Sequence, residues 1–274
     1  MLSTKAQSLA KQLFARSREE RLEEVTRLAK LRDSKSDRLL IELVEHRDVS
    51  LREWILDSLW EFGSLDAARK AARIGIRAKN NFVRDIAVQM LGQVGTLQDA
   101  AALIQVLQTD KDWVVRCSAA SSLGDLRTKG GESALALSVA KDRYWTVRAW
   151  ATNAIVRTHD KKHEPLLLER IKKEPEPAVL PSLYDAMIEL GHDEFAEKLI
   201  DLLFVSDYWY MVYLRTCVVL EGLYIDAGKP LPARAIQGLR KVIKYDVGMA
   251  AKWSARDLLK KAGIMVRVPA KKST

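Results

Sequence analysis

Cysteine and long apolar runs are both scarce in this sequence of 274 residues. Its two cysteines, Cys117 and Cys217, lie in apolar stretches with helical spacing, where a cysteine usually behaves as a small buried hydrophobe, so we expect no disulfide framework. Charged residues interrupt every apolar stretch well before the roughly 20 residues that a membrane span requires. Lys11, Arg16 and Arg18 interrupt the N-terminal region where a secretory signal would carry its apolar run. These features predict a soluble, cytoplasmic protein that does not bind or span a membrane.

The short motifs of common catalytic sites are also missing from the sequence. It contains no glycine-rich phosphate loop and no Gly-x-Ser-x-Gly elbow. His159 and His163 have the spacing of a zinc-binding helix, but no glutamate follows His159 and Pro165 comes soon after, so we interpret the segment as an exposed turn. We therefore predict a protein that is not an enzyme, with no catalytic residue, no metal site and no cofactor.

Basic residues outnumber acidic ones by 45 to 36, which gives a net charge of +9 and favours an acidic partner such as a nucleic acid or an acidic protein. The excess is concentrated near the C-terminus. Residues 256–274 carry six basic residues and one acidic residue, and so supply more than half of the net charge. We treat residues 264–274 as a basic C-terminal tail.

A repeat of 32 residues dominates the sequence. The pattern Val-Arg-x-x-Ala occurs three times, and with the matching arginine of the preceding repeat it forms a column of arginines 32 residues apart: Arg52, Arg84, Arg116 and Arg148. One period later the column holds Leu180, although the apolar frame continues. Because the same spacing recurs in order, we infer tandem copies of one structural element.

A second column of apolar residues keeps the same period. Within each repeat its members are three and four residues apart, which places them on one face of a helix; they are Leu39/Leu40/Leu43, Ala71/Ala72/Gly75, Leu103/Ile104/Leu107, Leu135/Ala136/Val139, Leu167/Leu168/Ile171 and Leu199/Ile200/Leu203. Turn residues fall between the two columns, at Gly63-Ser64, Gly95-Thr96, 129–131, 159–161 and 191–193. Each repeat is thus predicted to be a pair of amphipathic helices, with Asp48, Asp110, Asp142 or a nearby residue capping the first helix.

The residues around Asp110, Val115-Arg116, Ala119 and Leu123-Gly124 resemble the HEAT-like repeats first associated with phycobilisome lyases. The resemblance covers roughly residues 35–263 and implies an all-α fold, a right-handed α-solenoid of helical hairpins. We predict that residues 3–31 form one long helix within an N-terminal cap of residues 1–34. Bilin-lyase activity is not carried over, because that repeat occurs in proteins of many functions.

Aromatic residues gather at the predicted turns between repeats, and we predict that this edge is a contact surface because tryptophan and tyrosine are enriched at binding hot spots. The residues are Trp113, Tyr144, Trp145, Tyr208, Trp209 and Tyr210. Packing between adjacent repeats is the alternative for each of them. Basic positions on the solvent side of the second helices, Arg73, Arg77 and Lys141, complete the predicted partner-binding set. Because these positions form no continuous basic track, they favour a protein surface over a nucleic-acid groove.

The arginine column has two interpretations. It could line a groove for phosphate, since a guanidinium binds phosphate in a bidentate manner. We interpret it instead as structural, with each arginine paired to an acidic residue of a neighbouring turn, such as Asp85 or Asp112. A related alternative is a HEAT-like DNA glycosylase for alkylated bases, whose cleft would use Trp113, Trp145, Asp112 and Arg148.

Taken together, the sequence favours a protein-binding scaffold over a catalyst. We predict a non-enzymatic HEAT-repeat adaptor or inhibitor, which includes a toxin-neutralising immunity protein, acting on a protein partner with an acidic surface. Nucleic-acid binding, including alkylation repair, is the alternative. The sequence does not separate an adaptor from an inhibitor.

Overall fold

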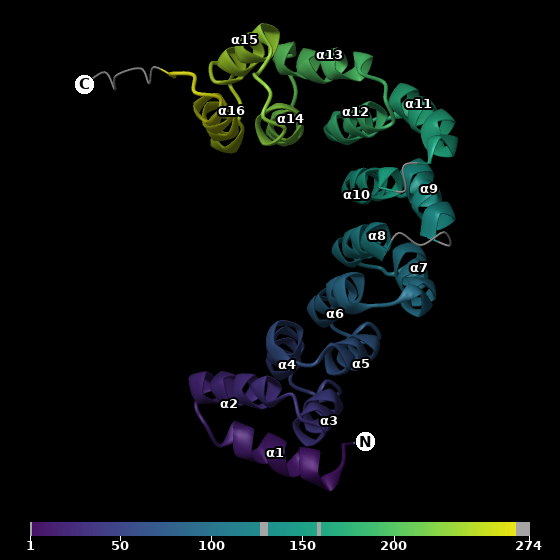
Figure 1. Ribbon diagram of the computed structural model, residues 1–274, viewed down its shortest axis with the longest axis vertical. Coiled ribbons are helices and arrows are strands. Elements are labelled where there is room, and N and C mark those ends of the chain that lie inside the picture. The colour runs from purple at the N-terminus through teal and green to yellow at the C-terminus, as the bar shows by residue number, and fades with distance from the viewer. Residues whose placement is uncertain (1, 127–130, 158–159, 267–274) are drawn as a thin grey trace, which may run out of the picture. The chain divides into compact units, whose positions relative to one another are not determined.

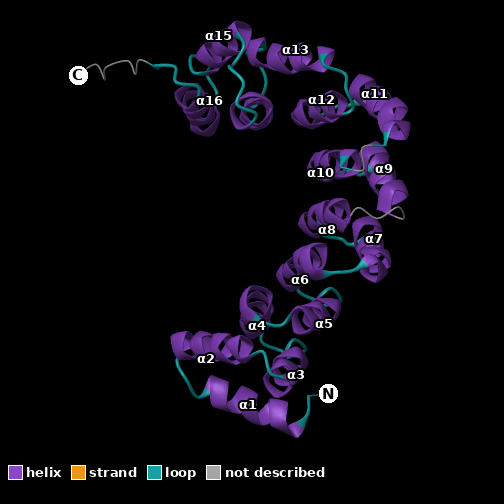
Figure 2. Ribbon diagram, in the orientation of Figure 1, coloured by secondary structure: helices purple, strands orange, loops and turns teal. Residues whose placement is uncertain are grey.

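The chain is described here from a computed structural model (Figures 1 and 2) that describes residues 2–126, 131–157 and 160–266. Helices and turns make up the whole of these ranges, and no strand occurs in them. The chain divides into two compact units, an N-terminal unit of residues 1–138 and a C-terminal unit of residues 139–274. Each unit is described separately.

The N-terminal unit is a stack of antiparallel helical pairs in two layers. Helices α2, α4, α6 and α8 pack side by side in one layer, and α1, α3, α5 and α7 form the other (Figure 1). Their bounds are α1 Thr4–Phe14, α2 Arg18–Leu31, α3 Ser34–Leu43, α4 Val49–Phe62, α5 Leu65–Gly75, α6 Asn81–Val94, α7 Ala100–Thr109 with η1 Leu97–Asp99 before it, and α8 Trp113–Leu126. Helix α9, Gly131–Lys141, begins in this unit and ends in the next.

The C-terminal unit repeats the same two-layer plan. Helices α10, α12, α14 and α16 pack in sequence in one layer, and in the other layer α11 and α13 pack on α12 while α15 packs on α16 (Figure 1). The bounds are α10 Trp145–Val156, α11 Glu164–Lys173 after η2 Lys161–His163, α12 Leu180–Glu189 after η3 Pro177–Val179, α13 Glu194–Asp201 with η4 Leu202–Phe204, α14 Tyr210–Leu220 with the π-helical η5 Glu221–Asp226, α15 Ala233–Val242 and α16 Met249–Lys261. The predicted all-α solenoid of helical hairpins is therefore confirmed.

One part of the N-terminal prediction is wrong: residues 3–31 form two helices, α1 and α2, not one. The break is at Ser17, which begins α2 with a capping box. The Glu20 N–H donates to Ser17 Oγ at 3.2 Å, and the Ser17 N–H donates to Glu20 Oε2 at 2.8 Å. Because this exchange satisfies donors that a helix start leaves free, it favours a new helix over continuation of α1.

The predicted capping aspartates differ in their roles. Asp48 caps α4 as expected, because its carboxylate accepts the Leu51 N–H at 2.8 Å. Asp110 and Asp142 do not cap the following helix; each instead accepts the N–H two residues further on. The predicted exposed turn at the two histidines is also corrected at His163, which is buried at the end of η2, while His159 lies outside the described residues.

Two arginines of the column, Arg84 and Arg148, are structural, and their partners lie 26 residues later, where the second helix of the same repeat ends. Arg84 Nε and Nη2 donate to the two carboxylate oxygens of Asp110 at 2.7 and 2.8 Å. Arg148 makes the same bidentate contact, with Nε and Nη2 donating to the two carboxylate oxygens of Glu174. We call Arg84–Asp110 and Arg148–Glu174 the ladder pairs. The partner of Arg84 is thus Asp110 and not Asp85 or Asp112.

Each ladder pair also fixes backbone on both sides of the turn. Arg84 Nη1 donates to the carbonyls of Ala78 and Lys79 at 3.0 and 2.9 Å, while Asp110 accepts the Asp112 N–H at 2.9 Å. In the second pair, Glu174 additionally accepts the Glu176 N–H at 2.9 Å. The pair therefore joins the start of the first helix to the end of the second with charge-assisted hydrogen bonds.

The ladder acids make stability sensitive to acid. Burial opposes ionisation of Asp110 and Glu174, but hydrogen bonds from Arg84 and from Arg148 with Arg170 outweigh it, and the pKa of each carboxyl lies below its usual value. The unfolded chain therefore binds protons at these two carboxyls at a higher pH than the folded chain does. The contribution of the two carboxylates to the free energy of unfolding is complete above the unfolded pKa and is lost as the pH falls through the folded pKa. We expect the guanidinium chloride concentration at the midpoint of unfolding to fall steadily below about pH 4.

Glu174→Gln provides the test of this pH dependence. The variant has lost the low-pKa carboxyl of one ladder pair, so it should be less stable than the parent at pH 7 and its unfolding midpoint should change less between pH 5 and pH 3. Equal changes in the two proteins over that range would contradict the assignment of acid sensitivity to the ladder.

Candidate protein-binding site

Four of the six predicted aromatic residues come together at the N-terminal ends of α10 and α14. The rings of Trp145 and Trp209 meet edge to face with centroids 5.6 Å apart, and those of Trp209 and Tyr210 do so at 5.5 Å. Tyr144 immediately precedes Trp145 and is exposed. We call Tyr144, Trp145, Trp209 and Tyr210 the aromatic edge.

Local structure explains why these rings stay at the surface. Tyr144 and Trp209 occupy the N-cap positions of α10 and α14, where the backbone is extended and the side chain leaves the helix axis. Trp209 and Tyr210 are each 41% exposed, whereas Trp145 is half-buried against the core of the unit. The Trp209 indole Nε1 donates to Glu176 Oε1 at 2.9 Å. This hydrogen bond fixes the ring in place while its face stays exposed.

Positive charge surrounds the aromatic edge. The Arg143 guanidinium lies over the Tyr144 ring at 4.9 Å from its centroid, and that of Arg215 lies over Trp145 at 5.8 Å. Lys141, the last residue of α9, is exposed three residues before Tyr144. Guanidinium groups over aromatic faces are attracted by the ring electrons. The surface thus combines rigid apolar anchors with a basic rim.

The remaining predicted site residues lie elsewhere. Tyr208 is half-buried and packs on Tyr213, so its role is in the core. Arg73 is engaged within the N-terminal unit, where Nε and Nη2 donate to Asp99 at 2.6 and 3.1 Å. Trp113 begins α8 in the N-terminal unit and is 39% exposed.

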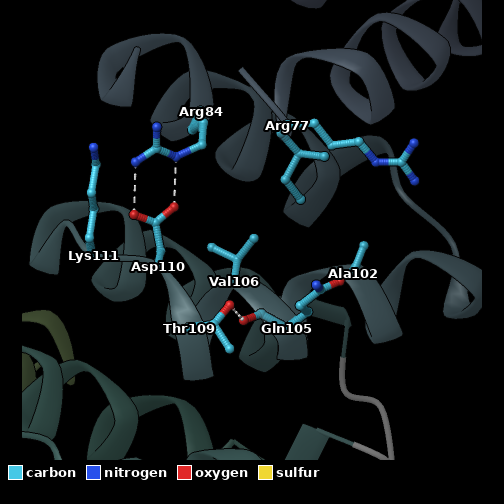
Figure 3. A pocket seen from close by; sticks show the side chains of 9 residues that line it. Arg77, Arg84, Ala102, Gln105, Val106, Thr109, Asp110 and Lys111 are labelled. Atoms are coloured by element: carbon cyan, nitrogen blue, oxygen red, sulfur yellow. Dashed lines mark hydrogen bonds and ion pairs between the residues drawn. The ribbon is translucent and has the colours of Figure 1, made fainter. Parts of the chain in front are cut away.

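Arg77, the last predicted residue, lines a pocket of about 530 Å³ in the N-terminal unit. Figure 3 shows Arg77 on one side, Lys111 on the other and the side chain of Val106 between them, with the Arg84–Asp110 ladder pair forming part of the wall. Gln105 and Thr109 of α7 complete its polar lining, and Thr109 Oγ1 donates to the Gln105 carbonyl at 2.7 Å. Three cationic side chains, those of Arg77, Arg84 and Lys111, and the carboxylate of Asp110 therefore surround the apolar residues of the pocket, a surface suited to binding.

Sequence reasoning missed three residues that contact the aromatic edge: Arg143, Glu176 and Arg215. A usable signal existed for two of them. The bonds from Trp209 to Glu176 and from Arg215 to Ser182 each join residues 33 apart, one more than the repeat. Residues about one repeat apart therefore lie side by side, and counting back one repeat from Trp209 and Arg215 would have pointed to their neighbours.

The residues of the glycosylase alternative have structural roles. Arg148 is buried and donates to Glu174 and to the Asp142 carbonyl. Asp112 accepts from the Asn81 amide at 2.5 Å and from the Val114 N–H at 2.9 Å. Arg148 is thus engaged within its own repeat, and Asp112 joins its turn to Asn81 of the preceding repeat.

Two layers of helical pairs joined by ladder pairs define this chain as an α-solenoid of HEAT-like hairpins. Comparison with known proteins agrees: HEAT repeats are matched over residues 36–124, which confirms the resemblance predicted from the sequence. No curated protein matches the sequence. In the described residues, no helix combines the length and apolar character needed to cross a membrane.

Two solved structures are similar to this chain. One is the complex of CpcE and CpcF of the phycocyanin lyase from Nostoc sp. PCC7120, with 20% identity, a TM-score of 0.54, and coverage of 82% of this chain and 94% of the other. The second is YibA of E. coli, with 19% identity, a TM-score of 0.50, and coverage of 90% and 87%. At these identities the likeness concerns the fold.

Proposed function

We propose that this protein is a non-enzymatic scaffold that binds another protein through the aromatic edge. The observation that carries the proposal is the exposed Trp209 ring, held rigidly by Glu176 and packed edge to face on Trp145 and Tyr210. Aromatic anchors that are fixed before binding lose little conformational entropy on association, and they dominate the energetics of many interfaces. The complex formed by the similar CpcE and CpcF chains supports a protein as the partner class.

The charge around the edge indicates an acidic partner. Lys141 and Arg143 are exposed beside Tyr144, and Arg215 lies over Trp145. Complementary charge raises the association rate and disfavours basic competitors. We propose an adaptor or an inhibitor of a cytoplasmic protein, and an immunity protein that covers a toxin is one such inhibitor.

Affinity capture from the native lysate tests this proposal, with and without nuclease and at two salt concentrations. We expect a stoichiometric protein partner that survives nuclease. Lys141→Glu should retain less of it than the parent at low salt, and the difference should shrink at high salt because the rim charge is screened. Lys244→Glu is the matched control: this exposed lysine lies after α15, and the same charge change there should leave capture unaltered.

Recovery of nucleic acid alone, lost at the higher salt, would overturn the proposal in favour of the nucleic-acid alternative. Equal capture by Lys141→Glu and by the parent would leave the proposal of a protein partner standing. It would contradict the proposal that the partner binds through an acidic surface.

A further inference from the structure

The arginine column contains one member without its ladder acid. Asp110 and Glu174 follow their arginines by 26 residues, in the first non-helical position after α7 and α11. For Arg52 the same count leads to Ala78, which has the matching place in the 32-residue repeat but lies three residues after the end of α5 at Gly75. A methyl group therefore stands where the repeat elsewhere places a carboxylate.

The Arg52 side chain is left without the bonds that its counterparts make. Its Nε is buried and has no hydrogen-bond partner, and its guanidinium forms no hydrogen bond or ion pair with the described residues. Arg84, one repeat later, makes two such bonds to Asp110 and two to backbone carbonyls. A buried donor without an acceptor is costly, so an acceptor that reached this guanidinium would relieve that cost.

The backbone of the turn adds a second donor. In the ladder pairs the carboxylate also accepts the N–H two residues further along, as Asp110 does from Asp112. The corresponding group at Ala78 is the Asn80 N–H, which donates no hydrogen bond to the described part of the chain because the methyl group of Ala78 offers no acceptor. A carboxylate here would thus find the same two kinds of donor.

The surroundings are basic. Arg77 and Lys79 flank Ala78 and are exposed, as is Arg47 in the preceding turn. Two carboxylates are also near: that of Asp48 is used as the N-cap of α4, where it accepts the Leu51 N–H, and that of Glu53 interacts with the charge of Arg52 without forming an ion pair with it. Charge therefore favours an incoming anion at this place.

We propose that Arg52, with the Asn80 N–H, is a receptor site for a carboxylate side chain of an acidic protein partner. The ladder pairs supply the template: a planar guanidinium edge meets a planar carboxylate through two parallel bonds, a match that favours a carboxylate over a spherical anion. The site lies in the N-terminal unit and shares no residue with the aromatic edge, so its existence does not depend on that edge.

NMR of the arginine Nε–H groups in the full chain tests the site, with the Arg52 signal assigned by its loss in Arg52→Lys. Sodium acetate and a blocked tetraglutamate peptide are titrated at constant ionic strength against chloride. We expect the Arg52 Nε–H signal to shift saturably with both, the peptide acting at the lower concentration. In Ala78→Asp the new side chain should take the ladder position, abolish the shift and raise the Tm by about 2–4 °C. Ala101→Asp, an equal charge change at an exposed position near the start of α7, should leave the ligand-induced shift of the Arg52 signal as in the parent.

Absence of a saturable shift in the parent protein would overturn the proposal, as would an undiminished shift in Ala78→Asp. Inorganic phosphate in a parallel titration that binds more than about tenfold tighter than acetate would reassign the site to phosphate and overturn the protein carboxylate as its ligand. None of these outcomes requires the partner of the aromatic edge, so a failure here is distinguishable from a failure of the proposed function.

Discussion

Replacement of Arg148 by leucine is expected to lower the free energy of unfolding of the C-terminal unit by about 3–5 kcal/mol, because it leaves a buried carboxylate with part of its compensation removed. The Glu174 side chain is completely buried and that of Arg148 is 7% exposed. Arg170 also pairs with Glu174 and keeps some compensation in the variant. The lost bonds to the Asp142 carbonyl loosen the turn before α10 as well.

Arg52→Leu is the internal control for this prediction, because the same substitution is made in the same column of the repeat. Arg52 has no ladder acid, so we expect a loss below about 1 kcal/mol or a small gain from the added apolar contact. Guanidinium unfolding followed by circular dichroism and by tryptophan fluorescence measures both variants. Similar losses at the two positions would show that the arginine side chain stabilises by packing and not by its ion pair.

Truncation of Trp209 to alanine is expected to weaken binding of the captured protein partner by about 2–4 kcal/mol, a change of roughly 30-fold to 1,000-fold in Kd. Trp209 is at the centre of the aromatic edge, between Trp145 and Tyr210. Its removal takes away the largest exposed ring and also frees Trp145 and Glu176 from the contacts that hold them. The loss should appear mainly in the dissociation rate, as it does for most buried anchors.

Trp253→Ala is the matched control for Trp209→Ala. Trp253 lies in α16 of the same unit and is 66% exposed, and none of the described ring contacts joins it to the aromatic edge. Its removal should leave the partner's Kd within about twofold if the edge is the interface. Circular dichroism spectra of both variants establish that the helices remain. A larger loss from Trp253→Ala than from Trp209→Ala would move the interface to α16.

The fold was predictable because its information is periodic. The recurrence of Val-Arg-x-x-Ala and of the apolar columns defines helical pairs, since residues three and four apart share a helix face. The break at Ser17 was missed although the Ser17 and Glu20 pattern of a capping box is visible in the sequence. The ladder acids were misassigned because an acid 26 residues away meets the arginine only after the second helix returns to the same end of the repeat.

The site was less predictable than the fold, for a physical reason. A ring at a turn faces solvent or core according to the backbone torsions there, which composition does not reveal. Tyr208 and Trp209 are adjacent, yet Tyr208 packs on Tyr213 while Trp209 is exposed. Likewise, the positive charge of Arg73 is counted correctly from the sequence but is neutralised by Asp99 in the next hairpin. Most of the predicted basic tail, residues 267–274, lies outside the described residues.

The constant 26-residue span of the ladder pairs has a consequence for how the chain folds. Each ladder pair closes a loop of the same modest length. The chain entropy lost in forming it is therefore the same for each pair and does not grow along the stack. Long-range order then accumulates from identical short-range steps, as in a one-dimensional lattice with nearest-neighbour coupling. The repeat that contains Arg52 lacks a ladder pair, so its two helices are joined less strongly than those of the repeats that have one. We expect cooperative folding of neighbouring hairpins to be interrupted most easily at this repeat.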